Sequence, residues 1–425
     1  MPIESLTDIT GFLNAHDTHL NASFALVPSE NQLSPLARIA YQSDAYARYF
    51  FNEKEVFGRW SFEGGSIAGK IQTELLVPGL CKIGGAKHVN LHGISGLTAM
   101  IVALTALSEE SGVTVLSVPV EFGGHPDTGY VGAKLGCHMK PIPFSAFDQP
   151  DIDALHQECK RSRPKLIYID HATHLFPLDL SKVISAIKDA SPETTVHVDT
   201  SHVNGLIWGG VLDNPLDCGA DSYGGSTHKT FPGPHKAVLF TNDDDLNMKI
   251  ILTAVNMISH HHTASVISLA FAVHEWITCG GEDYARQIVL NAKAFAKALE
   301  ERGLDIAQRD GQHTENHQVW MSAPGAWNAY DLASTMFRAG LVVNPFNPLP
   351  GFTEAAIRFG VAEPTKLGLK EADMSALADL VAAVSLEGED PGKVADRTRE
   401  LRSRFECAYC VPAAEVKSLR DKMLP

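Results

Sequence analysis

Between residues 70 and 245, short β-branched runs alternate with helical patterns, and this alternation constrains the fold more than any other feature. Four runs are typical of buried strands: VTVLSV (113–118), KLIYI (165–169), TTVHVD (194–199) and AVLF (237–240). Two intervening segments have the period of amphipathic helices: DIDALHQEC (151–159) and SKVISAIKDA (181–190). Strands that alternate with helices predict an α/β fold whose mostly parallel sheet is covered by helices.

The pattern changes after about residue 250. A long helical stretch covers 264–303, and strand-like QVWMSA (318–323) and AIRFGV (356–361) come before further helices. We therefore expect three parts. They are an N-terminal helix and arm (1–40), a large domain (41–285) and a smaller C-terminal α+β domain (286–425).

Composition narrows the class of partner. The chain has 425 residues with 44% hydrophobic content, and its net charge of −15 argues against nucleic-acid or membrane surfaces and favours a small-molecule partner. Seven scattered cysteines predict reduced thiols in the cytoplasm, with Cys407 and Cys410 exposed in a C-terminal helix. The start, MPIESLTDITGF, lacks the features of a signal peptide, and no apolar run is long enough to span a bilayer.

Two motifs are weaker than they first look. GGSIAGK (64–70) is close to a phosphate-binding P-loop, but Ile71 stands where that motif needs Ser or Thr, so no P-loop is predicted. SHHHTAS (259–265) contains three adjacent histidines, which point in different directions on any regular element. This favours a pocket wall or a loop over a metal site, and no metal is predicted.

A lysine and an aspartate carry the strongest chemical signal. GGSTHKTFPGPHK (224–236) places Lys229 in a stretch too broken for a helix, with His228 and Thr230 as hydrogen-bonding neighbours. A lysine that forms an imine with a carbonyl cofactor needs a partly desolvated amine. Asp199 ends a buried strand, where parallel sheets bind ligands, and its carboxylate suits a pyridinium nitrogen. The alternative is that Asp199 caps the next helix.

Two glycine-containing loops complete the pattern. HGISGLTA (92–99) opens a helix, so Ser95 and Gly96 lie where backbone N–H groups and the helix dipole bind anions. FGGHPDTG (122–129) follows a predicted strand and presents His125, whose ring can stack on a flat cofactor. With Lys229 and Asp199, these loops predict a pyridoxal 5'-phosphate site.

The segment STHKTFPGP (226–234) resembles the cofactor-lysine segment of serine hydroxymethyltransferases, which are fold-type I pyridoxal phosphate enzymes. The similarity runs along most of the chain and includes PSENQLSP (28–35), GGH (123–125), VDTSHVNGL (198–206) and AAIRFGVAEPTKLGLKEAD (355–373). It implies that Ser29 and Arg358 bind the substrate carboxylate and that His202 lies near the phenolic oxygen of the cofactor. Thr173 lies next to Ala172, which replaces a family serine that contacts the ring.

The same resemblance implies a dimer with active sites at the subunit boundary, and chemistry at Cα and Cβ of an amino acid through a quinonoid. In YARYFFNEKEVFGRWSFEGG (46–65), Tyr49 and Glu55 match the family's catalytic Tyr and general acid/base Glu, with Glu53 as the alternative to Glu55. Lys229 and His125 complete the catalytic set that we expect.

Departures from the family bear on the substrate. MISHHHTAS (257–265) replaces a glycine-rich loop, and His235 replaces an Arg. The chain looks more like the divergent branch that includes L-threonine transaldolases. We therefore expect a cytoplasmic homodimer that performs aldol or transaldol chemistry on a β-hydroxy or other β-substituted amino acid in specialised metabolism. The alternatives are tetrahydrofolate-dependent serine/glycine hydroxymethyl transfer, and β-elimination or decarboxylation with deamination of a bulky amino-acid conjugate.

Overall fold

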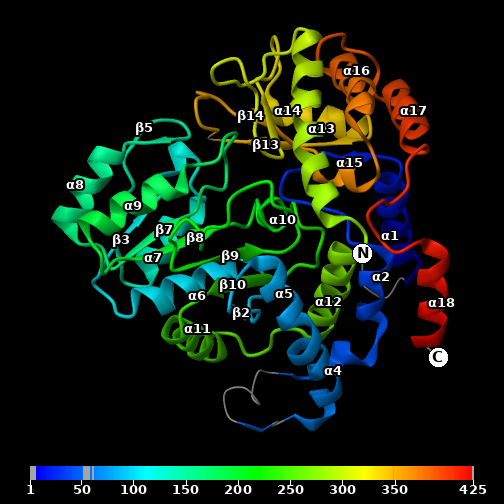
Figure 1. Cartoon of the computed structure of the whole chain (residues 1–425). Coiled ribbons are helices and arrows are strands. Elements are labelled where there is room, and N and C mark those ends of the chain that lie inside the picture. The colour runs from blue at the N-terminus through cyan, green and yellow to red at the C-terminus, as the bar shows by residue number, and fades with distance from the viewer. Residues whose placement is uncertain (1–5, 51–57, 60–61, 348, 424–425) are drawn as a thin grey trace. The chain divides into compact units, whose positions relative to one another are not determined.

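The computed structural model describes residues 6–50, 58–59, 62–347 and 349–423. Contacts within the chain divide it into two units (Figure 1). Unit 1 comprises 1–30, 287–348 and 352–408, and unit 2 comprises 31–286, 349–351 and 409–425. The division into an arm, a large domain and a C-terminal domain stays a prediction.

Unit 2 contains a seven-stranded sheet with the order β2-β10-β9-β8-β7-β3-β4. Its strands are β2 (His88–Asn90), β3 (Thr114–Ser117), β4 (His138–Pro141), β7 (Leu166–Ile169), β8 (Thr195–Asp199), β9 (Ser222–Ser226) and β10 (Ala237–Thr241). The five strands from β4 to β9 run parallel, and β10 is antiparallel to both β9 and β2. The predicted α/β fold with a mostly parallel sheet is therefore confirmed, and the four predicted strands are β3, β7, β8 and β10.

The strands β2, β4 and β9 of this sheet were not predicted, and β9 has the least strand-like sequence of the three. It contains Gly224 and Gly225, and glycine is ordinarily depleted in strands. The structure explains both glycines by close approach. A Cβ on Gly224 would lie 2.0 Å from the carbonyl oxygen of Val238, and one on Gly225 would lie 2.2 Å from Oγ of Ser201. These close approaches require residues without a Cβ at both positions. The strand therefore has no β-branched run by which the sequence could reveal it.

Unit 2 also contains the helices that flank its sheet and others that pack on those helices. They are α2 (Pro35–Arg38), α4 (Ser66–Lys70), α5 (Val77–Gly84), α6 (Gly96–Ser108), α7 (Pro126–Lys134), α8 (Ile152–Ser162), α9 (Leu180–Ala190), α10 (Asn204–Trp208), α11 (Asp244–Met257), α12 (Thr263–Thr278) and α18 (Ala413–Met423). The helices α8 and α9 contain the two segments predicted as helical. A π-helical turn, Ile71–Leu76, follows α4, and the short pair β5 (Phe144–Ala146) and β6 (Gln149–Pro150) precedes α8.

The central helix α6 is apolar on nearly its whole surface, because it packs between the sheet and α11 (Figure 1). Its buried side chains form one core cluster with apolar residues of β3, β7 and β10, and Val131 of α7 packs against the same cluster. Ser95 begins α6 with a capping box, in which its hydroxyl accepts from the N–H of Thr98 and the Thr98 hydroxyl accepts from the N–H of Ser95. The sequence thus places this helix start at a defined residue beside the sheet.

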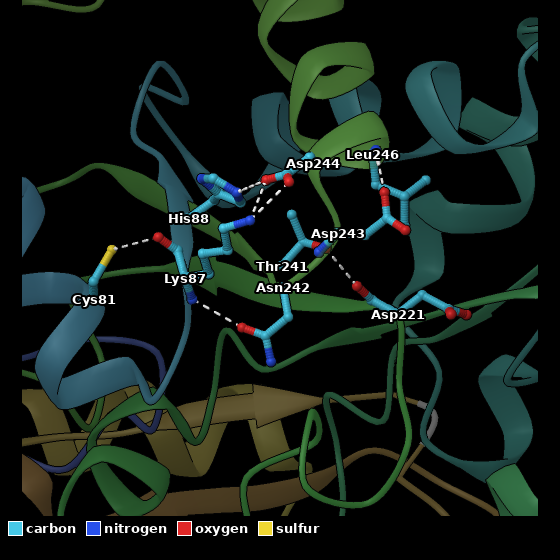
Figure 2. Close-up of polar contacts among 9 residues, drawn as sticks. All are labelled: Cys81, Lys87, His88, Asp221, Thr241, Asn242, Asp243, Asp244 and Leu246. Carbon is cyan, nitrogen blue, oxygen red and sulfur yellow. Dashed lines mark hydrogen bonds and ion pairs between the residues drawn. The ribbon is translucent and has the colours of Figure 1, made fainter.

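The antiparallel edge of the sheet is tied to α11 by charged side chains (Figure 2). Lys87 Nζ lies 2.6 and 2.7 Å from the two carboxylate oxygens of Asp244, and His88 Nε2 lies 2.6 Å from one of them. These two contacts lower the pKa of Asp244. Asp243 caps α11 by accepting from the N–H of Leu246. These contacts tie β2 and the residue before it to the start of α11.

Unit 1 contains a three-stranded antiparallel sheet, β11 (Gln318–Met321), β14 (Ala356–Gly360) and β13 (Asn344–Phe346), in that order. The short parallel pair β1 (Phe24–Ala25) and β12 (Leu341–Val342) belongs to the same unit. Its helices are α1 (Leu6–Asn21), α14 (Ala329–Arg338), α15 (Ala362–Lys366), α16 (Met374–Ser385) and α17 (Pro391–Arg402). Strands β11 and β14 were both predicted.

Two local predictions need correction. The predicted helix over 264–303 is two helices, α12 and α13 (Gly281–Glu301), because Gly280 has a φ of +83° that ends the first one. Cys407 and Cys410 were expected as exposed residues of a helix, but both are half-buried and lie in the non-helical segment between α17 and α18. Within the described residues, the helices are too short or too polar for any of them to cross a membrane.

Candidate active site

A cavity of about 180 Å³ opens at the carboxyl ends of the parallel strands of unit 2. It is lined by Gly96, Leu97, Met100, His125, Asp170, Ala172, Asp199, Ser201, His202, Ser226, His228 and Lys229. Asp170 follows β7, Asp199 ends β8 and Ser226 ends β9, so three neighbouring strands supply its floor. Ligands of open α/β sheets bind at this edge. Six of the predicted site residues meet here: Gly96, His125, Asp199, His202, His228 and Lys229.

The main chain around Lys229 is held on both sides. Thr227 closes the loop at its base, since its N–H donates to the carbonyl of Lys236 (3.0 Å) and its hydroxyl to the carbonyl of Pro234 (2.7 Å). The amide of Asn31 donates to the carbonyl of Lys229 itself (2.5 Å). Thr230 donates to the carbonyl of His202 (2.9 Å). A lysine on such a fixed loop presents its amine to the cavity in a defined position.

Asp199 is oriented by two donors. The hydroxyl of Tyr168 donates to Oδ2 (2.8 Å), and the N–H of Ser201 donates to Oδ1 (2.9 Å). The following helix, α10, begins after Val203 and has no side-chain cap, so the alternative prediction that Asp199 caps it is wrong. The carboxylate is therefore available to the cavity that it lines.

The start of α6 forms another part of the cavity wall. Gly96, its first residue, lines the cavity, and Ser95 directly precedes it as the N-cap. A Cβ on Gly96 would lie 3.3 Å from Cβ of Ser226 and 3.4 Å from Oγ of Ser201, so the glycine keeps this corner open. The first N–H groups of a 13-residue helix attract an anion such as a phosphate.

Two histidines flank the cavity and differ in environment. His125 is the N-cap residue of α7 and is half-buried, with Nδ1 accepting from the N–H of Asp127 (3.2 Å). Burial lowers the pKa of His228 to about 3, together with the neighbouring His235 and Lys229. Its ring stacks on that of His235, with centroids 3.9 Å apart. His228 is thus neutral at physiological pH and adds no charge next to Lys229.

Other predicted residues lie away from this cavity or outside the described residues. Ala172 lines the cavity, whereas the adjacent Thr173 is buried and donates its N–H to the carbonyl of Gly123 (2.9 Å). Tyr49 is 46% exposed and stacks on His260, with ring centroids 4.6 Å apart. Glu55 and its alternative Glu53 lie outside the described residues.

The two residues expected to bind the substrate carboxylate belong to unit 1. Arg358, on β14, is 5% exposed and donates through Nε (3.1 Å) and Nη2 (2.7 Å) to Oδ1 of Asn344. Its guanidinium lies over the ring of Phe346, 4.3 Å from the centroid, and burial lowers its pKa to about 10, so it stays cationic. Ser29 is half-buried in a turn.

Three residues of the site were missed from the sequence: Asn31, Tyr168 and Asp170. Asn31 stands two residues after the predicted substrate-binding Ser29, and Tyr168 lies inside a predicted buried strand. Asp170 directly follows that strand, as Asp199 ends the next one, so the same strand-end pattern was available for both. The carboxylate of Asp170 is fully buried, and burial together with the charge of Asp199 raises its pKa to about 8.

The three adjacent histidines do point in different directions, as predicted. His261 is fully buried, with Nε2 2.9 Å from Oε1 of Gln72, so it is a core residue and not a pocket wall. His260 stacks on Tyr49, and His262 meets the ring of Tyr46 edge-on, with centroids 5.0 Å apart. Among the residues that the structure describes, no group of three or more His, Cys, Asp or Glu side chains is arranged to hold a metal ion.

This donor set defines a class of enzyme. A lysine on a fixed loop, an aspartate at a strand end and a helix N-terminus fit the aldehyde, the pyridine nitrogen and the phosphate of pyridoxal 5'-phosphate, and the fold is that of a fold-type I enzyme dependent on this cofactor. The sequence profile of serine hydroxymethyltransferase matches residues 79–381. The chain belongs to the serine hydroxymethyltransferase family.

Known relatives refine this placement. An L-threonine:uridine-5'-aldehyde transaldolase of an Amycolatopsis species is 41% identical over 357 residues, which cover 84% of this chain and 86% of that protein. A serine hydroxymethyltransferase of Korarchaeum cryptofilum is 31% identical over 430 residues, covering 95% and 96%. The crystal structure of L-threonine transaldolase from Pseudomonas fluorescens, in its internal aldimine state, superposes with a TM-score of 0.90 at 26% identity, covering 99% and 98%.

Proposed function

We propose that this enzyme is an L-threonine transaldolase of specialised metabolism. In this reaction L-threonine and an acceptor aldehyde yield acetaldehyde and a new β-hydroxy-α-amino acid. The Cα–Cβ bond of threonine breaks, and Cα forms a new bond to the carbonyl carbon of the acceptor. The observation that carries the proposal is the 41% identity with a threonine transaldolase across most of both chains, in a chain whose cavity holds the lysine and aspartate of this chemistry.

In our proposal the residues of the cavity hold the cofactor by complementary chemistry. Lys229 carries its aldehyde carbon, Asp199 faces the pyridine nitrogen, and Ser95 and Gly96 offer the N–H groups of α6 to the phosphate. His125 stacks on the ring and His202 lies near the phenolic oxygen. When bound, pyridoxal phosphate supplies an electron sink that makes the bonds at Cα labile.

The remaining roles concern the substrate. Arg358 and Ser29 bind the amino-acid carboxylate, for which a guanidinium provides two parallel donors. The Cα–H bond of threonine is kept in this transfer, so the amine of Lys229 serves to hold the cofactor and moves no proton at Cα. Neutral His228 next to it leaves that amine without a competing cation. Glu55 and Tyr49 exchange a proton with the β-hydroxyl group, which must lose its proton when the Cα–Cβ bond breaks.

We further propose that the enzyme is a cytoplasmic homodimer whose partner subunits share active sites. Family membership supports the dimer, and seven cysteines without a disulfide among the described residues fit a reducing compartment. Chromatography coupled to light scattering at micromolar concentration measures the oligomeric state directly. A monomer with full activity would contradict shared sites.

The test is acetaldehyde release from L-threonine, followed with a coupled alcohol dehydrogenase. We expect release to accelerate when an acceptor aldehyde is added, with uridine-5'-aldehyde as the first acceptor because a 41% identical relative uses it. The new amino acid should appear in equal amount by mass spectrometry. Acetaldehyde release that ignores every acceptor would contradict transfer and indicate a simple aldolase.

A second candidate is serine/glycine hydroxymethyl transfer, which the family match and the 31% identical archaeal enzyme favour. Formation of glycine from L-serine only in the presence of tetrahydrofolate would establish it over the transaldolase. Lys229→Ala should abolish either activity and the visible absorbance of the bound cofactor. The exposed Lys160 provides a matched control, since Lys160→Ala should leave both unchanged.

A further inference from the structure

The loop that presents His125 (residues 118–125, the His125 loop) is hydrogen-bonded at both ends to one side chain, that of Asp170. Asp170 accepts from the N–H of Val118 through Oδ1 (3.2 Å) and from the N–H of His125 through Oδ2 (3.1 Å). Oδ2 also accepts a short hydrogen bond from the hydroxyl of Thr128, one turn into α7. The end of β3, the end of the loop and the start of α7 therefore converge on a single side chain.

The rest of the loop is packed against the segment that follows Asp170. A Cβ on Gly123 would lie 2.0 Å from the carbonyl oxygen of Thr173, and the Thr173 N–H donates to the carbonyl of Gly123 (2.9 Å). Gly124 is equally confined, since a Cβ there would lie 2.0 Å from the carbonyl of Val118. The glycines thus allow a close fit, and the carboxylate fixes the end of the loop that carries the ring.

The ring of His125 branches from backbone that Asp170 holds at two points of residues 125–128. Nδ1 of the ring accepts from the N–H of Asp127 (3.2 Å), two residues along the same loop-to-helix junction. The position of the imidazole therefore depends on this stretch of backbone. Both His125 and Asp170 line the cavity, so a shift of this backbone changes the cavity wall directly.

The cost of burying this carboxylate argues for a specific role. Asp170 is 1% exposed, and the second carboxylate of the cavity, Asp199, repels its charge. Among the described residues, the hydrogen bonds that its side chain accepts from other residues come from the His125 loop and the first turn of α7. Both side-chain oxygens of Asp170 accept from this loop or helix, whereas an asparagine of the same size has only one accepting oxygen.

We infer that Asp170 is a positioning residue that fixes the His125 ring against the bound cofactor. This inference rests on the proposed role of His125 in stacking on the cofactor ring. It assigns a function to a residue that touches the reaction only through another one. It also explains why a second aspartate follows a strand next to the one that ends at Asp199.

The test measures cofactor binding to the apoprotein for four single variants and for two of them combined with His125→Ala. Asp170→Asn keeps the side-chain size but presents an N–H₂ group to donors, so we expect the dissociation constant for pyridoxal phosphate to rise on the order of tenfold or more and the visible band of the bound cofactor to shift. Asp148→Asn is the matched control. Asp148 is also buried and accepts from two backbone N–H groups, of Leu175 (3.1 Å) and Phe176 (3.0 Å), but it does not line the cavity.

The third variant is His125→Ala, and it gives the decisive comparison. If Asp170 acts through His125, then Asp170→Asn should weaken binding strongly in the native background and barely at all in the His125→Ala background. Equal weakening in both backgrounds, or equal losses from Asp170→Asn and Asp148→Asn, would show a merely structural role and overturn the inference. Unchanged binding and spectrum in His125→Ala would instead refute the proposed role of His125, so the two failures are distinguishable.

The fourth variant guards against misfolding of Asp170→Asn. Thr128→Val removes one donor from Oδ2 and keeps the shape of the side chain. It should weaken cofactor binding in the same direction by a smaller factor, again only when His125 is present. A Thr128→Val protein with unaltered dissociation constant and spectrum would overturn the inference even if Asp170→Asn could not be purified.

Discussion

Lys236, seven residues after Lys229, should lower the stability of this protein near neutral pH. Its side chain is fully buried, and Nζ donates to the carbonyl of His261 (2.7 Å). In the part of the chain that the structure describes, no carboxylate forms an ion pair with it. Burial lowers its pKa from 10.5 to about 7, and the nearby His92 is kept neutral because burial and Lys236 lower its pKa to about 4.

The sign of the pH dependence follows from proton binding. Between pH 7 and 10.5 the unfolded chain binds a proton at Lys236 that the folded chain does not, so the free energy of unfolding should rise with pH by about 1.4 kcal/mol per pH unit. At pH 7 the destabilisation amounts to about 5 kcal/mol, and it stays near that value at lower pH. Lys236→Met removes this term but leaves the carbonyl of His261 without its donor, at a cost of roughly 1–3 kcal/mol.

We therefore expect Lys236→Met to stabilise the apoprotein at pH 7 by roughly 2–4 kcal/mol. The gain should shrink by roughly 2 kcal/mol between pH 7 and pH 9. Urea unfolding of both proteins at half-unit pH intervals measures the difference, with Lys160→Met as an exposed control that should show neither effect. A Lys236→Met protein that is less stable at every pH, by a constant amount, would refute the reasoning and show that Lys236 stays charged in a compensated site.

Three further predictions concern the cavity and its supports. Tyr168→Phe removes the hydroxyl that donates to Asp199, so cofactor affinity should fall about tenfold while the melting temperature barely changes; absorbance titration of the apoprotein measures it. Arg358→Lys should raise the KM for L-threonine at least about tenfold, with a smaller change in kcat, because an ammonium cannot donate in parallel to a carboxylate. Gly225→Ala should cost about 1–3 kcal/mol of stability, because its Cβ would lie 2.2 Å from its nearest neighbour. Gly129→Ala, inside α7 with open space around its Cβ, should instead stabilise by roughly 0.5–1 kcal/mol in thermal unfolding.

Much of the large sheet was predictable because its strands are buried on both faces. Such strands consist of continuous apolar, β-branched runs, and β3, β7, β8 and β10 all fit that pattern. The strand β9 breaks it, since SYGGS contains no β-branched residue. Its glycines are required by the approach of Ser201 and Val238 from neighbouring segments, and such contacts are invisible in one sequence.

The candidate site was predictable to the extent that its chemistry lies in short motifs. Lys229, Asp199 and Gly96 are each marked by their immediate neighbours, and all three line the cavity. Asn31 was missed because its contact, the carbonyl of Lys229, is 198 positions away along the chain. The predicted helix at Cys407 and Cys410 was wrong because it rested on local composition, whereas tertiary packing determines the conformation of this segment.

Asp170 shows where the sequence pattern ends and the structure becomes necessary. It and Asp199 are both carboxylates at the ends of adjacent, fully buried strands, so the sequence treats them alike. Their donors separate them. Asp199 receives one side-chain donor, from Tyr168, and one backbone N–H close by, whereas Asp170 receives its donors from the loop and helix that carry His125. Asp199 accepts two hydrogen bonds and lines the cavity, where a ligand can reach it. Asp170 accepts from the neighbouring loop and helix, so it determines the shape of the cavity wall beside it. In our proposal, two adjacent strand ends therefore supply one group that contacts the cofactor, Asp199, and one that positions such a group, Asp170.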